Sequence, residues 1–486
     1  MDRLIALLAE LGYWVAAVLT VLLAIVASGH AILYKRDTRA AVSWVGLIWL
    51  VPVVGAVLYA LLGVNRIRRR ATMLRGETRR LSGVYAALGG AAAALGDVLG
   101  DEHRHLGTLA RLVDRVCRRP LTAGNAVTPL VNGDAAYPAM IAAIDDARRS
   151  IALSTFIFDN DPAGRAFVDA LERATRRGVQ TRVLIDGLGA RFSWPPVVPL
   201  LQQRGIPVAR FMPTIAPWRA PFWNLRNHRK VLVVDGTVGF TGGMNLRQDH
   251  IVTANSRNPV QDLQFRVDGP VVQHLMEAFG EDWVFTTGEL LAGPDWFPQL
   301  ARAGTVAARG IADGPDEDFE KLRWVIQGAL GVAAESIRIM TPYFLPDATL
   351  TAMLNVAALR GVRVEILLPA KNNHPLADWA SQALLWQFVK NACTVYYTPP
   401  PFDHTKLMLV DEAWVLIGSA NWDPRSLRLN FEFNVECYDP ALGAQLGRFM
   451  DEKRASGRIV TAAELDGMSL PRRLRNGVAR LASPYL

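Results

Sequence analysis

The chain has 486 residues, more than one ordinary hydrophobic core holds, so two or three domains are expected. Hydrophobic residues make up 51% of it and the net charge is +8, which argues against a wholly soluble protein and favours anionic partners. Three scattered cysteines form no CxxC pair and eight histidines show no ligand-like spacing, which argues against a disulfide framework and a zinc site.

The first element is a predicted transmembrane hairpin, residues 1–70. Gly12–Tyr34 and Ala40–Gly63 are apolar, and each is long enough to cross about 30 Å of hydrocarbon as a helix. A cluster of arginines follows the second stretch: Arg66, Arg68, Arg69, Arg70, Arg75, Arg79 and Arg80. Because positively charged flanks stay on the cytoplasmic side, the large C-terminal part is predicted to face the cytoplasm.

Two alternatives to a spanning hairpin stay open at this point. A cleaved signal peptide is disfavoured because the first apolar run is too long and a second run follows at once. A hairpin that enters the membrane without crossing it is permitted by Pro52 and Gly55, which lie inside the second stretch.

After the hairpin, residues 71–124 are rich in Arg and Ala and are predicted to form a basic, partly helical linker. From residue 125 the pattern changes to alternating strands and helices. Ser150–Asp161 is a predicted strand and loop, a helix ends at Gly178, and the next stretch returns as a strand. The same order recurs at Ser336–Asp347, followed by a helix that ends at Gly361 and another strand.

This repetition predicts the fold class. We expect an α/β protein with an N-terminal two-helix transmembrane hairpin and two duplicated α/β domains, residues 125–310 and 311–486, related by a pseudo-two-fold. The repeat is domain-sized and therefore not a short solenoid repeat. Alternating strands and helices predict a parallel or mixed sheet with helices on both faces.

Each predicted domain contains one copy of the motif H-x-K-x4-D-x6-G-[GS]-x-N. The first copy runs from His228 to Asn245 and the second from His404 to Asn421, with the same spacing throughout. A lone histidine is usually a buried structural residue. Five fixed residue types that occur in both halves of a duplicated body make coincidence negligible and reverse that expectation.

In each copy the residues after the histidine have the composition of a strand. Alternation with a period of two puts His228 and Lys230 on one face of that strand and Asp235 on the other. The second copy repeats the arrangement with His404, Lys406 and Asp411. The Asp-Gly pair at 235–236 predicts a turn into a return strand.

If the halves pack about a pseudo-two-fold, both His-Lys pairs converge with Asn245 and Asn421. One neutral histidine can attack phosphorus to form a phosphohistidine, and the other, protonated, can give its proton to the leaving alkoxide. The lysines and asparagines would hold the phosphoryl oxygens. The set therefore predicts phosphodiester chemistry that needs no metal and no cofactor.

Four carboxylates accompany the motifs. Asp262 follows the first motif and Glu432 the second, and both are candidates for orienting a catalytic histidine. Asp235 and Asp411 lie at predicted turns, and a catalytic and a structural role are equally open for them.

The two motifs, the hairpin segment "PVVGAVLYALLGVNR" and the stretches "TPYFLPD" and "GSANWDPRSLRLNFE" resemble the bacterial cardiolipin synthases of the phospholipase D superfamily. The resemblance covers nearly the whole chain. It implies two phospholipase D-like domains that transfer a phosphatidyl group between two phosphatidylglycerol molecules, giving cardiolipin and glycerol. It implies His228 as the nucleophile and His404 as the acid and base.

The same resemblance implies a multi-pass protein of the bacterial inner membrane, with phosphatidylglycerol and cardiolipin as partners and no nucleic acid. The chain departs from the family beside the first motif. Where relatives commonly have Trp-Arg-Asp, it has Val260, Gln261 and Asp262, so the carboxylate is kept and the arginine is lost. Any head-group contact of that arginine is therefore in question.

Other functions fit part of the pattern. A hydrolysing phospholipase D would share the motifs and use water as acceptor. A nuclease of the same superfamily fits the basic charge but not the apolar hairpin, and a non-enzymatic membrane protein would not need two intact motifs.

Two further stretches have open roles. The C-terminal helical stretch, with Leu470, Leu474, Val478 and Leu481 on one side, could lie on anionic lipid or pack on the body. The aromatic and basic stretch Phe211–Asn227 could dip into the bilayer or line a lipid entry.

Overall fold

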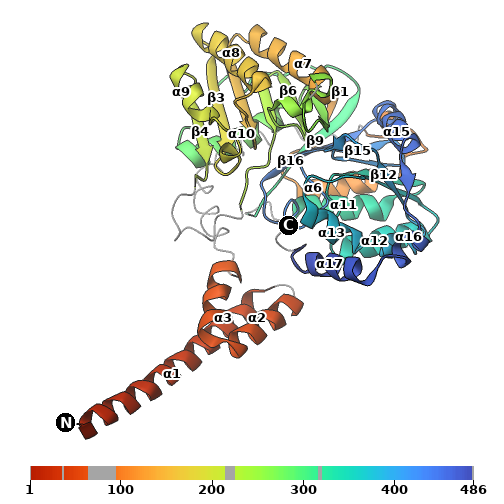
Figure 1. Cartoon of the computed structure of the whole chain (residues 1–486). Helices are drawn as coiled ribbons and strands as arrows, with labels where there is room; N and C mark the ends of the chain where they lie inside the picture. The colour runs from red at the N-terminus through yellow and green to blue at the C-terminus, as the bar shows by residue number, and fades with distance from the viewer. Residues whose placement is uncertain are drawn as a thin grey trace. The chain divides into compact units, whose positions relative to one another are not determined.

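The computed structural model describes residues 2–35, 38–63, 95–213, 225–254, 256–315 and 320–483. The chain forms two compact units, a small one that holds the described residues through Gly63 and a large one that holds those from Leu95 onward. Figure 1 shows the helical small unit and the large unit with its sheet. The arginine cluster after the second apolar stretch and most of Phe211–Asn227 lie outside the described residues.

The small unit consists of α1 (Asp2–Tyr34), α2 (Thr38–Leu50), α3 (Pro52–Leu58) and the π-helical turn η1 (Tyr59–Gly63). Within the described residues, one helix is long and apolar enough to cross a membrane, Glu10–Tyr34 in α1, with a mean hydropathy of 2.3. The second apolar stretch is broken after Leu50, because Pro52 has no N–H to continue the helical hydrogen bonds. The predicted pair of helices is thus one long helix and one interrupted one.

The interrupted stretch folds back against α1. His30 Nδ1 lies 2.7 Å from the Tyr59 hydroxyl oxygen, and the Tyr59 ring packs edge-on against Trp44. At Gly55 a Cβ atom would lie 2.5 Å from the Leu47 carbonyl oxygen, so only glycine permits this close return of the chain.

The large unit is built on one mixed sheet, which has 15 strands within the described residues. From edge to edge the strands are β17 (Arg458–Ile459), β12 (Thr394–Thr398), β11 (Arg363–Pro369), β10 (Ser336–Met340), β14 (Leu407–Val410), β15 (Trp414–Gly418), β16 (Glu432–Tyr438), β9 (Val306–Asp313), β1 (Thr122–Val131), β8 (Leu263–Asp268), β6 (Val238–Gly242), β5 (Val231–Val234), β2 (Ser150–Thr155), β3 (Gln180–Asp186) and β4 (Val208–Phe211). We call residues 122–287 the first half and residues 306–455 the second half.

The two halves meet at the antiparallel pair of β1 and β9. Outward from β1 the strand pairings are antiparallel as far as β2 and then parallel to β3 and β4. Outward from β9 they are antiparallel as far as β10 and then parallel to β11 and β12. Both halves therefore place their motif hairpin, β5 with β6 or β14 with β15, at the same position in the sheet.

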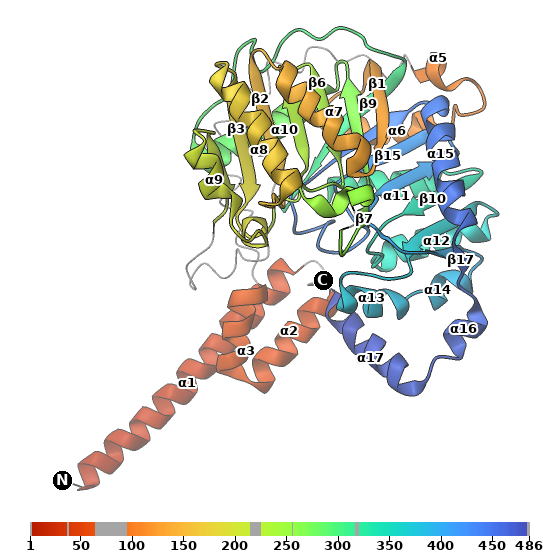
Figure 2. The same ribbon diagram turned by 45° about the horizontal axis from the view of Figure 1, so that its top comes forward.

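Helices cover both faces of the sheet, as Figure 2 shows. The first half carries α7 (Asn132–Asp146), α8 (Pro162–Arg176), α9 (Val197–Gln203) and α10 (Val272–Thr287). The second half carries α11 (Lys321–Val332), α12 (Ala348–Leu359), α13 (Pro375–Gln382), α14 (Trp386–Val389) and α15 (Pro440–Ala455), and α16 (Ala462–Asp466) and α17 (Leu470–Leu481) follow. Apolar residues of α10 and α15 share one core with strands of both halves. The predicted α/β class and mixed sheet are confirmed.

Part of the segment predicted as a linker belongs to the large unit. It contains α5 (Leu95–Leu99) and α6 (Leu106–Val116). Leu106, Leu109 and Val113 of α6 are fully buried in a core that also includes α11 and β10. Helix α6 is strongly amphipathic, and its apolar face completes the core of the second half.

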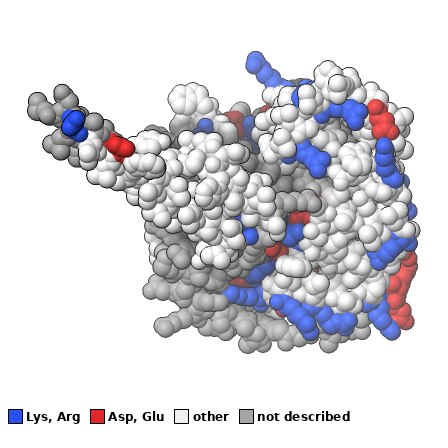
Figure 3. Space-filling model, turned by 90° about the horizontal axis from the view of Figure 1, so that it is seen from below, with Lys and Arg blue, Asp and Glu red and all other residues white. Residues whose placement is uncertain are grey.

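Helix α17 packs on α13 by one face and leaves its apolar face exposed. Asn476 Nδ2 and Arg472 Nη2 both donate to Gln382 Oε1, and the Arg475 guanidinium lies 4.4 Å from the Trp379 ring centre. Leu470, Leu474, Val478 and Leu481 are all exposed. On the face drawn in Figure 3, Lys and Arg side chains are more widespread than Asp and Glu. The helix thus packs on the body by its polar face, and the role of its apolar face stays a prediction.

Candidate active site

Just before each motif strand joins the sheet, the backbone of its histidine is hydrogen-bonded to the other half of the large unit. The sequence predicts His228 and Lys230 on a strand, but β5 begins only at Val231, and β14 likewise begins after Lys406. The reason is that the His228 amide donates to the Phe431 carbonyl at 2.9 Å, and the His404 amide donates to the Gln261 carbonyl at 2.7 Å. Each histidine backbone is thus bonded to the other half rather than to a neighbouring strand of its own.

The side chains of the two histidines cross between the halves in the same way. His228 Nδ1 lies 3.0 Å from both carboxylate oxygens of Glu432, and His404 Nδ1 lies 2.9 Å from Asp262 Oδ2. Both carboxylates are fully buried, while the histidines keep about a tenth of their side-chain surface exposed. Each Nδ1 is held by a carboxylate, so Nε2 is the ring nitrogen left to react.

The two lysines lie beside the histidines. Lys230 Nζ donates to the His228 carbonyl at 2.7 Å, and Lys406 Nζ donates to the His404 carbonyl. Burial lowers the pKa of Lys230 to about 7 and that of Lys406 to about 8, although the nearby carboxylates Glu432 and Asp262 oppose the effect. A bound phosphate would reverse these shifts by supplying a negative charge.

Both histidines are held in the neutral form. Burial lowers the pKa of His228, and Lys230 lowers it further, against the opposing effect of Glu432. Burial and the charges of Lys406 and Lys230 hold the pKa of His404 well below its ordinary value. Near neutral pH the ligand-free site therefore contains two unprotonated imidazoles.

The two orienting carboxylates differ in charge state. Burial alone would raise the pKa of Glu432, but contacts with His228 and Lys230 outweigh it and the pKa is lowered. Burial raises the pKa of Asp262 to about 6, and Lys406 offsets only part of that rise. Glu432 is thus the more firmly ionised partner.

The glycines of the motif allow close packing behind the histidines, and one of them makes room for Asp262. Gly242 and Gly418 have φ angles of 155° and 146°, where a side chain would be strained. A Cβ atom on Gly243 would lie 2.6 Å from both oxygens of Asp262. At the matching position of the second motif, Ser419 Oγ donates to Glu432 Oε2 at 2.5 Å.

We expect Gly243→Ala to lower turnover by about 10- to 100-fold without unfolding the chain, because the new methyl group displaces Asp262 and with it His404. The matched control is Gly280→Ala in α10, where an added Cβ meets no atom within 4 Å. Turnover and the thermal midpoint are measured for both variants. Equal turnover of the two would contradict the steric role given to Gly243.

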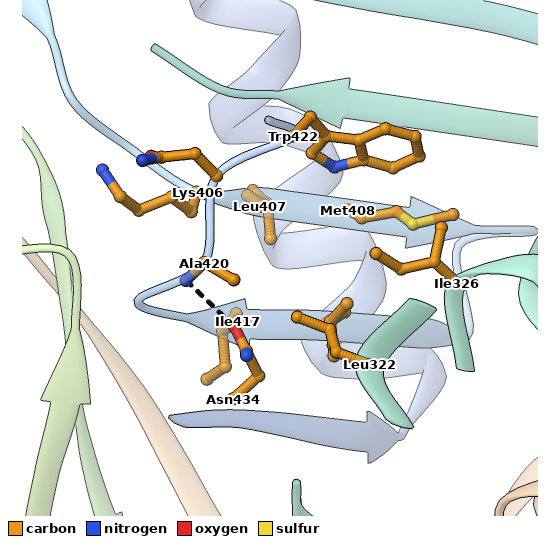
Figure 4. A pocket seen from close by; sticks show the side chains of 11 residues that line it. Leu322, Ile326, Lys406, Leu407, Met408, Ile417, Ala420, Trp422 and Asn434 are labelled. Carbon is orange, nitrogen blue, oxygen red and sulfur yellow. Dashed lines mark hydrogen bonds between the residues drawn. The ribbon is translucent and has the colours of Figure 1, made fainter. Parts of the chain in front are cut away.

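Both motif asparagines are buried, and Asn421 lines a small cavity together with Lys406. Asn245 Oδ1 accepts the Ile157 amide at 3.1 Å, and Asn421 is also buried. Figure 4 shows Lys406 at the edge of a small cavity behind the second motif, about 20 Å³ in volume and lined by residues that include Trp422 and Asn434. This volume is far below the several hundred Å³ of a typical ligand pocket, so it is no head-group site.

The motif aspartates lie at the other end of their strands, in the turns. Asp235 has a φ of 52° and accepts the amides of Arg148, Arg149 and Ser150 at 2.7 to 3.0 Å. Asp411, with a φ of 51°, accepts the corresponding amides at the start of β10 and contacts His105 Nε2 at 2.7 Å. These hydrogen bonds favour a structural role for Asp235 and Asp411 over a catalytic one.

We expect Asp411→Asn to destabilise the large unit by about 1–3 kcal/mol at pH 7 while turnover per folded molecule is retained. Hydrogen bonds from backbone amides and His105 hold the pKa of Asp411 below its ordinary value against the effect of burial. The stabilisation is therefore present above about pH 4 and is lost as the pH falls through the folded-state pKa. Thermal midpoints of wild type and variant should differ at pH 7 and converge in acid, and a constant difference would contradict this role.

Several neighbours of the site were not among the predicted site residues. The ring of Phe156 packs edge-on against His228, and the rings of Tyr343 and buried His250 lie about 6 Å from His404. At the position of the missing family arginine, Gln261 accepts a hydrogen bond from Lys453 of α15, which also pairs with Asp403 at 2.7 Å. Lys453 thus supplies a positive charge beside Gln261, although the two residues are far apart in the sequence.

Comparison with known proteins agrees with this geometry. The family model described as cardiolipin synthase, phospholipase D-like domain, matches residues 140–283 and 326–453, and a phospholipase D-nuclease N-terminal model matches residues 22–63. Cardiolipin synthase A of Pseudomonas putida (strain GB-1) is 31% identical over 96% of both chains. Cardiolipin synthase 1 of Bacillus anthracis is 30% identical over 93% of this chain and 90% of its own.

Among solved structures, phosphatidylserine synthase of Haemophilus influenzae Rd KW20 matches with a TM-score of 0.59 and 16% identity, covering 78% of this chain and all of that one. At that identity the likeness concerns the fold alone. The family model and the curated relatives extend over most of the chain. The chain therefore belongs to the cardiolipin synthase family of the phospholipase D superfamily.

Proposed function

We propose that this protein joins two phosphatidylglycerol molecules into cardiolipin and glycerol through a phosphohistidine. One observation carries the proposal most directly: each motif histidine is oriented by a carboxylate of the other half, next to a buried lysine. A nucleophile, an acid and phosphate-binding cations are the groups that a two-step phosphodiester exchange requires. The matching family gives the substrate class.

In the first step His228 Nε2 attacks the donor phosphorus, and a P–N bond forms as the P–O bond to the departing glycerol breaks. His404 gives its proton to the glycerol oxygen. Its pKa is low in the ligand-free site, but the negative phosphodiester beside it offsets Lys406 and Lys230 and so favours the protonated ring. The lysines, with Asn245 and Asn421, hold the phosphoryl oxygens.

In the second step His404, now neutral, takes the proton from a hydroxyl of the second phosphatidylglycerol. The hydroxyl oxygen attacks phosphorus, the P–N bond breaks, and His228 returns to its starting form. If water enters instead of the lipid hydroxyl, the product is phosphatidic acid. The acceptor alone therefore separates a synthase from a hydrolase.

The carboxylates support His228 as the nucleophile. A phosphohistidine ring carries positive charge, which a firmly ionised carboxylate stabilises best. Glu432 beside His228 has a lowered pKa, whereas the pKa of Asp262 beside His404 is raised to about 6. The same histidine–carboxylate pairs support Glu432 and Asp262 as the residues that orient the two imidazole rings.

We also propose the membrane arrangement and the domain limits. The small unit, residues 1–70, would anchor the chain in the bacterial inner membrane as a two-helix hairpin, with the large unit on the cytoplasmic side. Residues 71–124 would lead from it to two domains, 125–310 and 311–486, with α5 and α6 of that stretch packed into the large unit. The repeated order of strand pairing in the two halves supports a duplication with a pseudo-two-fold.

The test is incubation of purified full-length protein with phosphatidylglycerol vesicles in the presence of a chelator. Cardiolipin and glycerol in equal amounts are the expected products. Phosphatidic acid as the sole lipid product would contradict the synthase and indicate a hydrolase.

A further inference from the structure

Three arginines gather at the edge of the site: Arg191, Arg226 and Arg425. Arg191 is exposed and ends the short helix η4 (Gly189–Arg191), whereas Arg226 and Arg425 are half-buried. They come from the connection after β3, the residue two before His228, and the loop between β15 and β16. None of the three belongs to the H-x-K motif.

Hydrogen bonds hold these segments together. Asp186 Oδ2 accepts the Asn227 amide at 2.8 Å, and its Oδ1 accepts the Leu188 and Gly189 amides at 2.9 Å, just before Arg191. The Phe431 amide donates to the Arg226 carbonyl at 2.8 Å, and the Arg425 carbonyl accepts amides of the same loop. The position of the three arginines is therefore fixed by backbone contacts.

Aromatic contacts connect this cluster to both histidines. Phe192, next to Arg191, lies with its ring 6.2 Å from Phe156, which packs on His228. On the other side, the Tyr343 ring lies 6.3 Å from His404 and 5.7 Å from His374. Burial lowers the pKa of His374, and the charge of Arg425 adds to this effect. Arg191 is thus connected to His228 through Phe192 and Phe156, and Arg425 acts on His374, which packs on the Tyr343 ring beside His404.

The cluster brings like charges together. Burial lowers the pKa of Arg226, and repulsion from Arg425 and Arg191 adds to this effect against the attraction of Asp186. Both oxygens of Asp186 already accept backbone amides. Burial also lowers the pKa of Arg425, against the attraction of Asp423. Three arginines therefore face two carboxylates in a partly buried site, and a bound anion would relieve the remaining repulsion.

We propose that Arg226 and Arg425, with Arg191 at the exposed edge, bind the phosphodiester of the acceptor phospholipid. This inference rests on the proposed function. Cardiolipin has two phosphodiesters joined by one glycerol, so its synthesis needs a second phosphate site close to the reacting one. The lysines hold the reacting phosphate, and arginine's planar group suits the other. Water and simple alcohols carry no phosphate and need no such site.

The test compares two acceptors in one reaction of the full-length protein. Phosphatidylglycerol vesicles are supplied with ethanol, and cardiolipin and phosphatidylethanol are both quantified for wild type, Arg226→Gln and Arg425→Gln. We expect each variant to lower the ratio of cardiolipin to phosphatidylethanol by about 10- to 100-fold, because one charge-assisted contact to the acceptor is lost. The matched control, Arg448→Gln on the exposed side of α15, should keep the wild-type ratio.

Equal loss of both products, or an unchanged ratio, would overturn the acceptor site. If Arg425→Gln does not fold, Arg226→Gln and the conservative Arg226→Lys carry the test, and the lysine variant should retain an intermediate ratio. Wild-type protein that forms phosphatidylethanol but no cardiolipin would contradict the proposed function instead, so the two failures are distinguishable.

Discussion

His228→Asn should lower cardiolipin formation by about 10⁴- to 10⁶-fold, the range seen when a covalent nucleophile is removed. Asparagine keeps a polar group near Glu432 but cannot form the P–N bond. His404→Asn should cause a rate loss in a similar range with phosphatidylglycerol as the substrate, because its alkoxide leaving group needs a proton. Initial rates with labelled phosphatidylglycerol measure both variants.

A donor with an acidic leaving group separates the two roles. With a nitrophenyl phosphodiester, His404→Asn should still release a burst of nitrophenol, because that leaving group needs no proton, whereas His228→Asn should release none. The control is His103→Asn, since His103 bonds the Asp411 carbonyl away from the motif histidines. A burst from His228→Asn would contradict its role as nucleophile.

Glu432→Gln has the second largest expected effect, a loss of about 10²- to 10⁴-fold in turnover. The variant keeps a hydrogen-bonding group near His228 Nδ1 but removes the charge that stabilises the phosphohistidine. Because Glu432 raises the pKa of His228, its loss lowers that pKa further. The acidic limb of kcat/KM should therefore move to lower pH as the rate falls.

The pH profile separates this role from simple misfolding. Ser419→Ala serves as the milder comparison, because it removes one hydrogen bond to Glu432 and keeps the carboxylate. It should lose about tenfold or less in turnover and shift the acidic limb little. An acidic limb of Glu432→Gln that stays in place or moves to higher pH would contradict the electrostatic role.

Local sequence patterns predicted much of the fold. Strands Ser150–Thr155 and Ser336–Met340, the glycines that end the next helices, and the turn after each motif follow from periodicity and turn chemistry. The motif histidines and lysines of the two halves lie near enough to act on one another's pKa, because the two hairpins hold equivalent places in the sheet. The roles of all the site residues stay predictions.

The crossed pairing could not be predicted, because it depends on long-range contacts. Nothing in the spacing shows that Asp262 orients the histidine of the second motif and Glu432 that of the first. For the same reason the sequence placed His228 inside a strand, although its backbone bonds to Phe431 of the other half. The burial of α6 and the cluster around Arg226 also depend on segments far apart in the chain.

Trapping the covalent intermediate tests most directly whether His228 is the nucleophile. Wild-type protein is mixed with phosphatidylglycerol, quenched in base within the first turnover, digested and analysed by mass spectrometry. We expect a phosphatidyl adduct on the peptide that contains His228, and none in His228→Asn. An adduct on His404 alone, or turnover to cardiolipin without any histidine adduct, would contradict it.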